Sequence, residues 1–169
     1  EAAIAYKTRV YLHMRDWTNV ILEGNKLNGK YAMTANPDTP FASNNSNSES
    51  IFSIANGATN NPGVNGSLPS MYHPPIPAAA NGRGLIATSP IIWRDPTWLI
   101  DDKRRAEGTM VITGNAAYYP NTKFTNKYKD AVNKTDAAPI IRYAEVALNM
   151  AEAYARSNDV VEIVLWQTH

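Results

Sequence analysis

The residues with the clearest chemical potential are aromatic side chains in a loop-rich stretch of the sequence. Tyr72, Trp93 and Trp98 lie between turn signals, Arg94 follows the first tryptophan, and Tyr118 stands in an aromatic pair further along. A flat aromatic ring packs against the polarised C–H face of a sugar, while guanidinium, carboxylate and amide groups bind the hydroxyls at its rim. We therefore select these five residues as candidate ligand-binding residues for a neutral polyol such as an oligosaccharide.

Burial in a hydrophobic core is the alternative for each of these rings. The apolar run formed by Trp98, Leu99 and Ile100 favours burial of this tryptophan. Trp17 is predicted to be a core residue, because it continues the apolar stripe of a predicted helix.

The carboxylates of the sequence give little support for a catalytic function. Glycoside hydrolysis needs two carboxyl groups about 5 to 9 Å apart, and Glu145 and Glu152 would lie about 10.5 Å apart along one helix. The simpler interpretation is that Glu145 and Arg142 make packing and ion-pair contacts. Asp101-Asp102 is a second possible acid/base pair for such hydrolysis, and it begins a charged run over 101–105. This run is either a solvated surface or a device that fixes the neighbouring loops.

The sequence contains no pattern typical of a metal site, a catalytic nucleophile or a phosphate-binding loop. The sequence has no cysteine, and His13, His73 and His169 do not have the spacing of metal ligands. Gly82-Arg83-Gly84 lacks the remainder of a phosphate-binding loop. We therefore predict no catalytic residue, no metal site and no cofactor.

Composition excludes further classes of protein. The 169 residues carry a net charge of +1, which argues against a nucleic-acid partner because such binding depends on a basic surplus. No apolar run is long enough to span a bilayer. Only 18% of residues are charged, and 18 asparagines contribute to an uncharged polar surface. Such surfaces are frequent in proteins that act outside the cytoplasm or bind neutral polyols.

Two short helices are predicted over residues 1–25. The first seven residues indicate an amphipathic helix rather than a signal peptide. A break is expected at 13–16, with Asp16 as the N-cap of the second helix and its end at Gly24 or Asn25. The stripe that the first helix should bury consists of Ile4, Ala5, Thr8, Tyr11 and Leu12.

Residues 26–135 have the composition of loops with short strands, for example at 50–54. A stretch of this length without a long helix is unusual, so its loops either form a site or pack on other parts of a larger protein. A long helix is predicted over 136–158, with Pro139 in its first turn. The tail 159–169 contains a β-branched run that does not continue this pattern.

Four further segments follow one another along the chain. They are T-R-V-Y-L-H-M-R-D-W at 8–17 with Gly29-Lys30-Tyr31 after it, N-S-E-S-I-F-S-I at 47–54, D-K-R-R at 102–105 with Thr125-Asn126-Lys127-Tyr128 after it, and A-P-I-I-R-Y-A-E-V-A-L-N-M-A-E-A at 138–153. In this order they resemble the SusD/RagB family, the surface glycan-binding lipoproteins of Bacteroidetes. In that family a D-x-R-R segment precedes a pair of strands.

The resemblance implies a mainly α fold of tetratricopeptide-like helical pairs, with a long loop-rich insertion that contains short strands. Residues 1–169 would form a single partial domain. It would consist of the helix pair 1–25, the loop-rich region 26–135, the long helix 136–158 and the atypical tail 159–169.

The resemblance also implies non-catalytic binding of extracellular oligosaccharide or polysaccharide and its delivery to a TonB-dependent, SusC-like transporter. The protein would lie on the exposed surface of the cell outer membrane and contact it only through an N-terminal lipid anchor that is absent from this chain. We therefore expect the sequence to be part of a longer protein. Part of the family's glycan platform comes from loops in the region of Tyr72, Trp93 and Trp98. A helical-repeat module that binds another protein, without binding glycan, is the alternative function.

Overall fold

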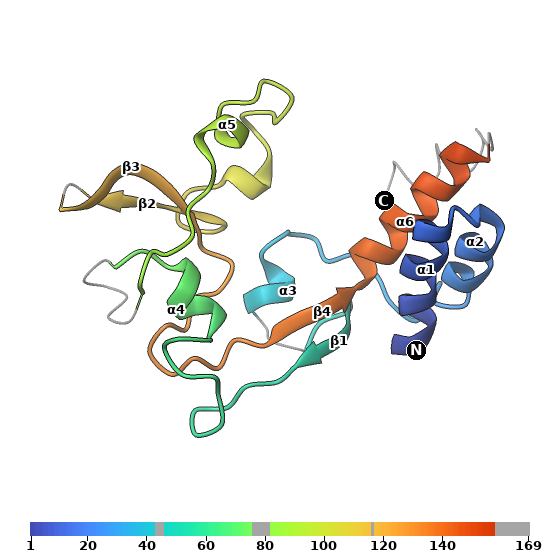
Figure 1. Ribbon diagram of the computed structural model, residues 1–169, viewed down its shortest axis with the longest axis horizontal. Helices are drawn as coiled ribbons and strands as arrows, with labels where there is room; N and C mark the ends of the chain where they lie inside the picture. Colours follow the sequence, from blue (N-terminus) through green and yellow to red (C-terminus); the bar gives the residue numbers. More distant parts are fainter. Residues whose placement is uncertain (43–45, 76–81, 116, 158–169) are drawn as a thin grey trace. The chain divides into compact units, whose positions relative to one another are not determined.

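A computed structural model describes residues 1–42, 46–75, 82–115 and 117–157 (Figure 1). Within these residues the chain forms six α-helices, one short 3-10 helix and four β-strands. They belong to two compact units, each assembled from segments that are distant in sequence. Unit 1 comprises Glu1–Thr34, Ser46–Ser53 and Pro139–His169, and unit 2 comprises Ala35–Asn45 and Ile54–Ala138.

Unit 1 begins with the predicted helix pair, α1 (Ala2–Met14) and α2 (Trp17–Asn25). The tight turn between them places Arg15 in the left-handed region, with φ of 59°. Asp16 caps α2, because its carboxylate accepts the backbone N–H of Asn19 at 3.2 Å. The break, the cap and the end of α2 are therefore confirmed.

The third helix of unit 1 is α6 (Tyr143–Arg156), and it is preceded by strand β4 (Ala138–Arg142). The prediction of a helix from residue 136 was wrong at its start. Pro139 stands here in a strand and not in a first helical turn, and β-branched Ile140 and Ile141 favour the extended chain. β4 pairs with β1 (Ser50–Ile54), the strand that the sequence predicts.

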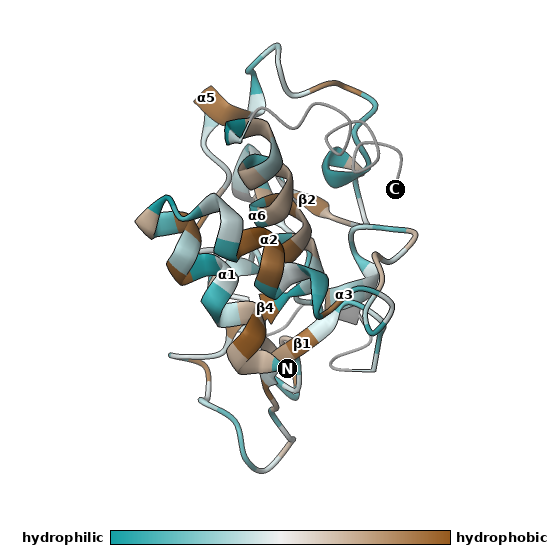
Figure 2. Ribbon diagram, turned by 90° about the vertical axis from the view of Figure 1, so that its right-hand side faces the viewer, coloured by the Kyte–Doolittle hydropathy of each residue, from teal (hydrophilic) through white to brown (hydrophobic). Residues whose placement is uncertain are grey.

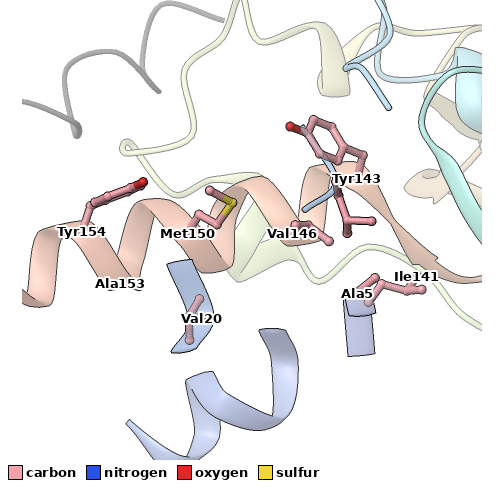
Figure 3. Packing of buried hydrophobic residues seen from close by; sticks show 9 residues of the cluster. Ala5, Val20, Ile141, Tyr143, Val146, Met150, Ala153 and Tyr154 are labelled. Atoms are coloured by element: carbon pink, nitrogen blue, oxygen red, sulfur yellow. The ribbon is translucent and has the colours of Figure 1, made fainter. Parts of the chain in front are cut away.

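The core of unit 1 lies where α1 and α2 pack against α6 (Figure 3). Val20 of α2 and Val146 and Met150 of α6 are fully buried there. A Cβ at Gly24 would stand 2.3 Å from Sδ of Met150, so α2 approaches α6 closely only because residue 24 has no side chain. Trp17 packs against this cluster and is partly buried.

Two ion pairs connect the motif segments of unit 1. Arg9 donates to both carboxylate oxygens of Glu145, at 2.5 and 2.8 Å. Glu49, only 2% exposed, pairs with Arg142 and accepts the hydroxyl of Thr34 at 2.9 Å. The expectation that Glu145 and Arg142 form ion pairs is confirmed, although each has a partner from another segment. These motif residues therefore hold the scaffold together.

The described part of unit 2 contains only short elements. Its strands β2 (Val111–Asn115) and β3 (Tyr118–Thr125) form an antiparallel pair in which Ile112 lies opposite Phe124, and they confirm the expected strand pair. The remaining elements are α3 (Thr39–Ala42), α4 (Leu68–Tyr72), α5 (Pro90–Trp93) and the 3-10 helix η1 (Lys103–Arg105). Phe41, Met110, Val111 and Phe124 are buried in this unit.

The expectation of a mainly α fold needs correction, because the described residues form a mixed structure of helices and short strands. In the ranges that the structure describes, helices are long only in unit 1, and the three α-helices of unit 2 span four or five residues each. Proline, glycine and asparagine in this region interrupt regular hydrogen bonding and limit each of these helices to about one turn. The tetratricopeptide-like pairing stays a prediction.

Candidate functional site

The two candidate tryptophans lie in the segment 88–105 of unit 2, which is held in place by local hydrogen bonds. Ser89 caps α5 by accepting the N–H of Ile91 at 3.3 Å, and Pro90 occupies the first helical position. Asp95 then closes a turn, because its carboxylate accepts the backbone N–H of Thr97 at 2.8 Å and its hydroxyl at 2.6 Å. This turn brings Trp98 back toward Trp93.

The indole rings of Trp93 and Trp98 lie edge to face. Their centroids are 5.6 Å apart and their planes meet at 82°, a favourable arrangement for aromatic pairs. The indole N–H of Trp98 donates to Oδ2 of Asp102 at 3.0 Å. Both side chains are half-buried, so the rings are neither free in solvent nor enclosed in the core.

Arg105, from η1, contacts both indoles. Its guanidinium carbon lies 4.3 Å from the ring centroid of Trp93 and 5.1 Å from that of Trp98. The same group donates to the main-chain carbonyls of the two tryptophans, at 2.8 Å for Trp93 and 2.6 Å for Trp98. One side chain therefore fixes both ends of the loop and the two rings.

Two ion pairs lie close to the two tryptophans. Arg104 donates to Asp102, which lowers the pKa of this carboxyl to about 2. Lys123 of β3 lies 5.3 Å from the ring centroid of Trp93 and forms an ion pair with Glu107 at 3.2 Å. Burial would raise the pKa of Glu107, but hydrogen bonds from Thr113 and Lys123 outweigh it and lower that pKa. Asp102 and Glu107 are therefore ionised at neutral pH.

Large aliphatic side chains surround the tryptophans and point into solvent. Ile91 and Ile92 in α5 are 82% and 57% exposed, and Leu99 and Ile100 are 64% and 84% exposed. Figure 2 shows α5 as a hydrophobic element. The apolar run after Trp98 is thus not buried in this chain.

The other three candidate residues lie at different places in unit 2. Tyr72, at the end of α4, has its ring 6.0 Å from Tyr128 in a second aromatic group. Arg94 follows α5 and is exposed. Tyr118 begins β3 opposite Asn115, and its side chain lies outside the described part of the structure. Of the five candidates, Trp93 and Trp98 are in ring contact, and Arg94 adjoins Trp93 in the chain.

Three of the four carboxylates considered for hydrolysis form ion pairs, and the fourth, Asp101, is exposed. Glu145 binds Arg9, Glu152 forms an ion pair with Arg156 at 3.3 Å, and Asp102 binds Arg104. His73 is buried with its Nδ1 3.0 Å from the carbonyl of Pro74, His13 is exposed, and His169 lies outside the described residues. Among the residues that the structure describes, no three His, Cys, Asp or Glu side chains gather as metal ligands would.

The charged run 101–105 has two interpretations from sequence, and the structure supports the second. Asp102 and Arg105 fix the loop that carries the tryptophans. The position of Lys123 has no signal in the sequence, because a residue of β3 approaches Trp93 only through the tertiary fold. Arg105 could be suspected from its place in D-K-R-R, but its contacts with both rings could not.

Comparison with known proteins gives a match to a family model over part of the chain. Residues 104–166 match the model of the SusD family, the family that the four sequence segments resemble. The matched range covers less than half of the chain; it includes Arg105, β2, β3 and α6 but neither Trp93 nor Trp98. No curated protein and no solved structure matches the chain.

Proteins of the SusD family are non-catalytic, glycan-binding lipoproteins of the outer-membrane surface that act in nutrient uptake with SusC-like transporters. In the present chain, a search of the described residues finds no helix with the length and apolarity that a bilayer crossing requires.

Proposed function

We propose that this chain binds extracellular oligosaccharide or polysaccharide without cleaving it. The observation that carries the proposal is the half-buried pair of Trp93 and Trp98, which is fixed by Arg105 in a loop of unit 2. A ring that is held rigidly and remains partly exposed can stack on a sugar face with little loss of side-chain entropy. The match to the SusD family supports the same ligand class.

Trp98 is the ring that we assign to stacking. Trp93 already has Arg105, Lys123 and Trp98 near its ring. Trp98 has two neighbours of this kind, Arg105 and Trp93, and its indole N–H is satisfied by Asp102. Arg94, exposed beside the pair, would donate hydrogen bonds to sugar hydroxyls. Tyr72 and Tyr118 stay candidates for contact with more distant sugar units.

The bound glycan would be delivered to a TonB-dependent, SusC-like transporter for uptake, at the exposed surface of the outer membrane. This part of the proposal rests on the family match and the sequence motifs. The tetratricopeptide-like scaffold would be contributed by α1, α2 and α6, which share one buried core in unit 1.

The second candidate function is a protein-binding module that takes no glycan. Four exposed aliphatic side chains favour it, because a protein partner would remove them from water: Ile91, Ile92, Leu99 and Ile100. Glycan binding depends on a flat ring, whereas protein docking depends on aliphatic area. Substitution of either kind of residue therefore separates the two functions.

Electrophoresis of the native chain through gels that contain a soluble polysaccharide tests the proposal. The gels would contain amylopectin, arabinoxylan or galactomannan as separate probes. We expect at least one to retard the wild-type chain, and Trp98→Ala to weaken this binding by about 1–3 kcal/mol, the range for loss of a stacked aromatic ring.

Ile100→Ala is the matched control, since it removes exposed apolar surface two residues away without removing a ring. We expect its retardation to equal that of the wild type. Equal retardation of Trp98→Ala and the wild type would contradict the assignment of Trp98. Failure of all three probes, with a tight protein partner lost on Ile100→Ala, would favour the protein-binding module.

A further inference from the structure

We propose that Arg105 is a positioning residue that sets the mutual geometry of Trp93 and Trp98 and thereby the affinity of the pair for glycan. The binding consequence rests on the proposed function, whereas the geometry of the pair can be measured without a ligand. Arg105 can have this role because its guanidinium contacts both the backbone and the ring of each tryptophan.

No single helix or strand contains both tryptophans and fixes their separation. α5 ends at Trp93, and Trp98 follows a turn closed by Asp95. Both main-chain carbonyls accept hydrogen bonds from the same guanidinium, through Nη2 for Trp93 and Nη1 for Trp98. The fixed fork of an arginine thus acts as a spacer between the two points of the backbone.

The guanidinium of Arg105 also contacts both indole rings. With its carbon 4.3 and 5.1 Å from the two centroids, the guanidinium lies within the range of cation–π attraction for both indoles. A lysine could reach one carbonyl or one ring, but its single ammonium cannot reproduce the planar double contact. The geometry therefore requires arginine and not only a positive charge.

The position of Arg105 also includes an unfavourable contribution to the free energy of folding. Its Nε is buried and, among the described residues, has no hydrogen-bond acceptor. An unsatisfied buried donor is unfavourable, and the surrounding contacts must outweigh it. A cation placed against two indoles despite this unfavourable contribution is better explained by the control of ring position than by general surface charge.

Near-ultraviolet circular dichroism of the free chain tests the geometry. Indoles held edge to face couple to each other, and Trp98→Phe identifies the part of the spectrum that belongs to the pair. We expect Arg105→Ala to remove this signal and Arg105→Lys to reduce it, with the far-ultraviolet spectrum of unit 1 helices unchanged. Methylguanidinium should restore the signal of Arg105→Ala, whereas sodium chloride at equal ionic strength should not.

Lys103→Ala is the matched control, because Lys103 belongs to the same 3-10 helix and its Nζ contacts Ala35 and Asn36 instead of the indoles. It should leave the tryptophan signal unchanged. In the polysaccharide gels, Arg105→Ala should lose about tenfold in affinity, since loss of preorganisation weakens binding without removal of a ligand contact.

The outcomes of the two measurements are distinguishable. An unchanged tryptophan signal in Arg105→Ala would overturn the positioning role, whatever the gels show. Loss of the signal in a chain that no polysaccharide retards would support the role of Arg105 in ring geometry and contradict the proposed function. Rescue of Arg105→Ala by sodium chloride alone would also overturn the inference, because it would show that charge and not shape is required.

Discussion

Protonation of Asp102 should affect the tryptophan pair, because this carboxylate accepts the indole N–H of Trp98. The hydrogen bond from Arg104 lowers the pKa of this carboxyl from 3.8 to about 2. A group with a lowered pKa in the folded state contributes stability above its unfolded pKa, and this contribution is lost as pH falls toward the folded value. The loop around Trp98 should therefore be insensitive to pH from neutrality down to about pH 4.

We predict that the near-ultraviolet signal of the tryptophan pair changes only between about pH 4 and pH 2. A pH titration followed by circular dichroism measures this. Asp102→Asn provides the control, since it cannot titrate and should lack the transition assigned to residue 102. A wild-type transition near neutral pH would show that another group governs the loop.

Loss of the Glu49 carboxylate should destabilise unit 1. This carboxylate is 2% exposed and binds Arg142 and Thr34. We expect Glu49→Gln to lower the free energy of unfolding by about 2–3 kcal/mol, because Arg142 would keep its charge with a weaker partner. Urea denaturation followed by helical circular dichroism checks this value.

Glu152→Gln is the matched control, because its ion pair with Arg156 lies on the exposed face of α6. It should cost no more than about 0.5 kcal/mol. Equal effects of the two variants would contradict a structural role of the buried pair.

At the residue scale, the sequence indicates which side chains are chemically able to act but not which ones meet. Trp93 and Trp98 could be selected because they lie between turns. Their contact with Arg105 depends on the path of the loop, which no local pattern encodes. Tyr72 shows the same limit, since it has the right chemistry but packs beside Tyr128 instead.

At the scale of elements, the close approach of α2 and α6 gives a steric prediction. Gly24→Ala places a Cβ against Met150 at 2.3 Å, so we expect a loss of about 1–3 kcal/mol in the free energy of unfolding despite the better helix propensity of alanine. Thermal or urea unfolding measures the loss. In the double variant with Met150→Ala, part of the loss should be recovered relative to the sum of the single variants.

Gly57→Ala is the control for Gly24→Ala, because a Cβ added at residue 57 would meet no atom within 4 Å. This substitution should be neutral or slightly stabilising, since it restricts the unfolded chain. Destabilisation by both variants to the same extent would exclude the steric explanation.

Elements with a strong local signal are predicted well. The helix pair follows from the apolar spacing and the cap at Asp16, and the strand at 50–54 follows from its β-branched and aromatic residues. The start of α6 was misplaced because alanine and proline before Ile140 also suit a helical first turn. Pairing with β1, which is a tertiary contact, selects the strand.

At the scale of the whole molecule, the two units should differ in local stability. Unit 1 has a buried core shared by three helices, whereas the segment 90–100 of unit 2 exposes four large aliphatic residues. We predict slower amide hydrogen exchange in α2 and α6 than in α5, because local opening is easier where few apolar contacts are lost. Faster exchange in α6 than in α5, measured by mass spectrometry, would contradict this ranking.

The central claim, that an arginine-held tryptophan pair binds glycan, is tested most directly by protection of indoles from oxidation. The chain would be treated with N-bromosuccinimide in the presence and absence of the retarding polysaccharide, and oxidation at each tryptophan would be quantified by peptide mass spectrometry. We predict that polysaccharide protects Trp98 and leaves the oxidation of Trp17, in unit 1, unchanged. Retardation by the polysaccharide without protection of Trp98 would contradict the claim.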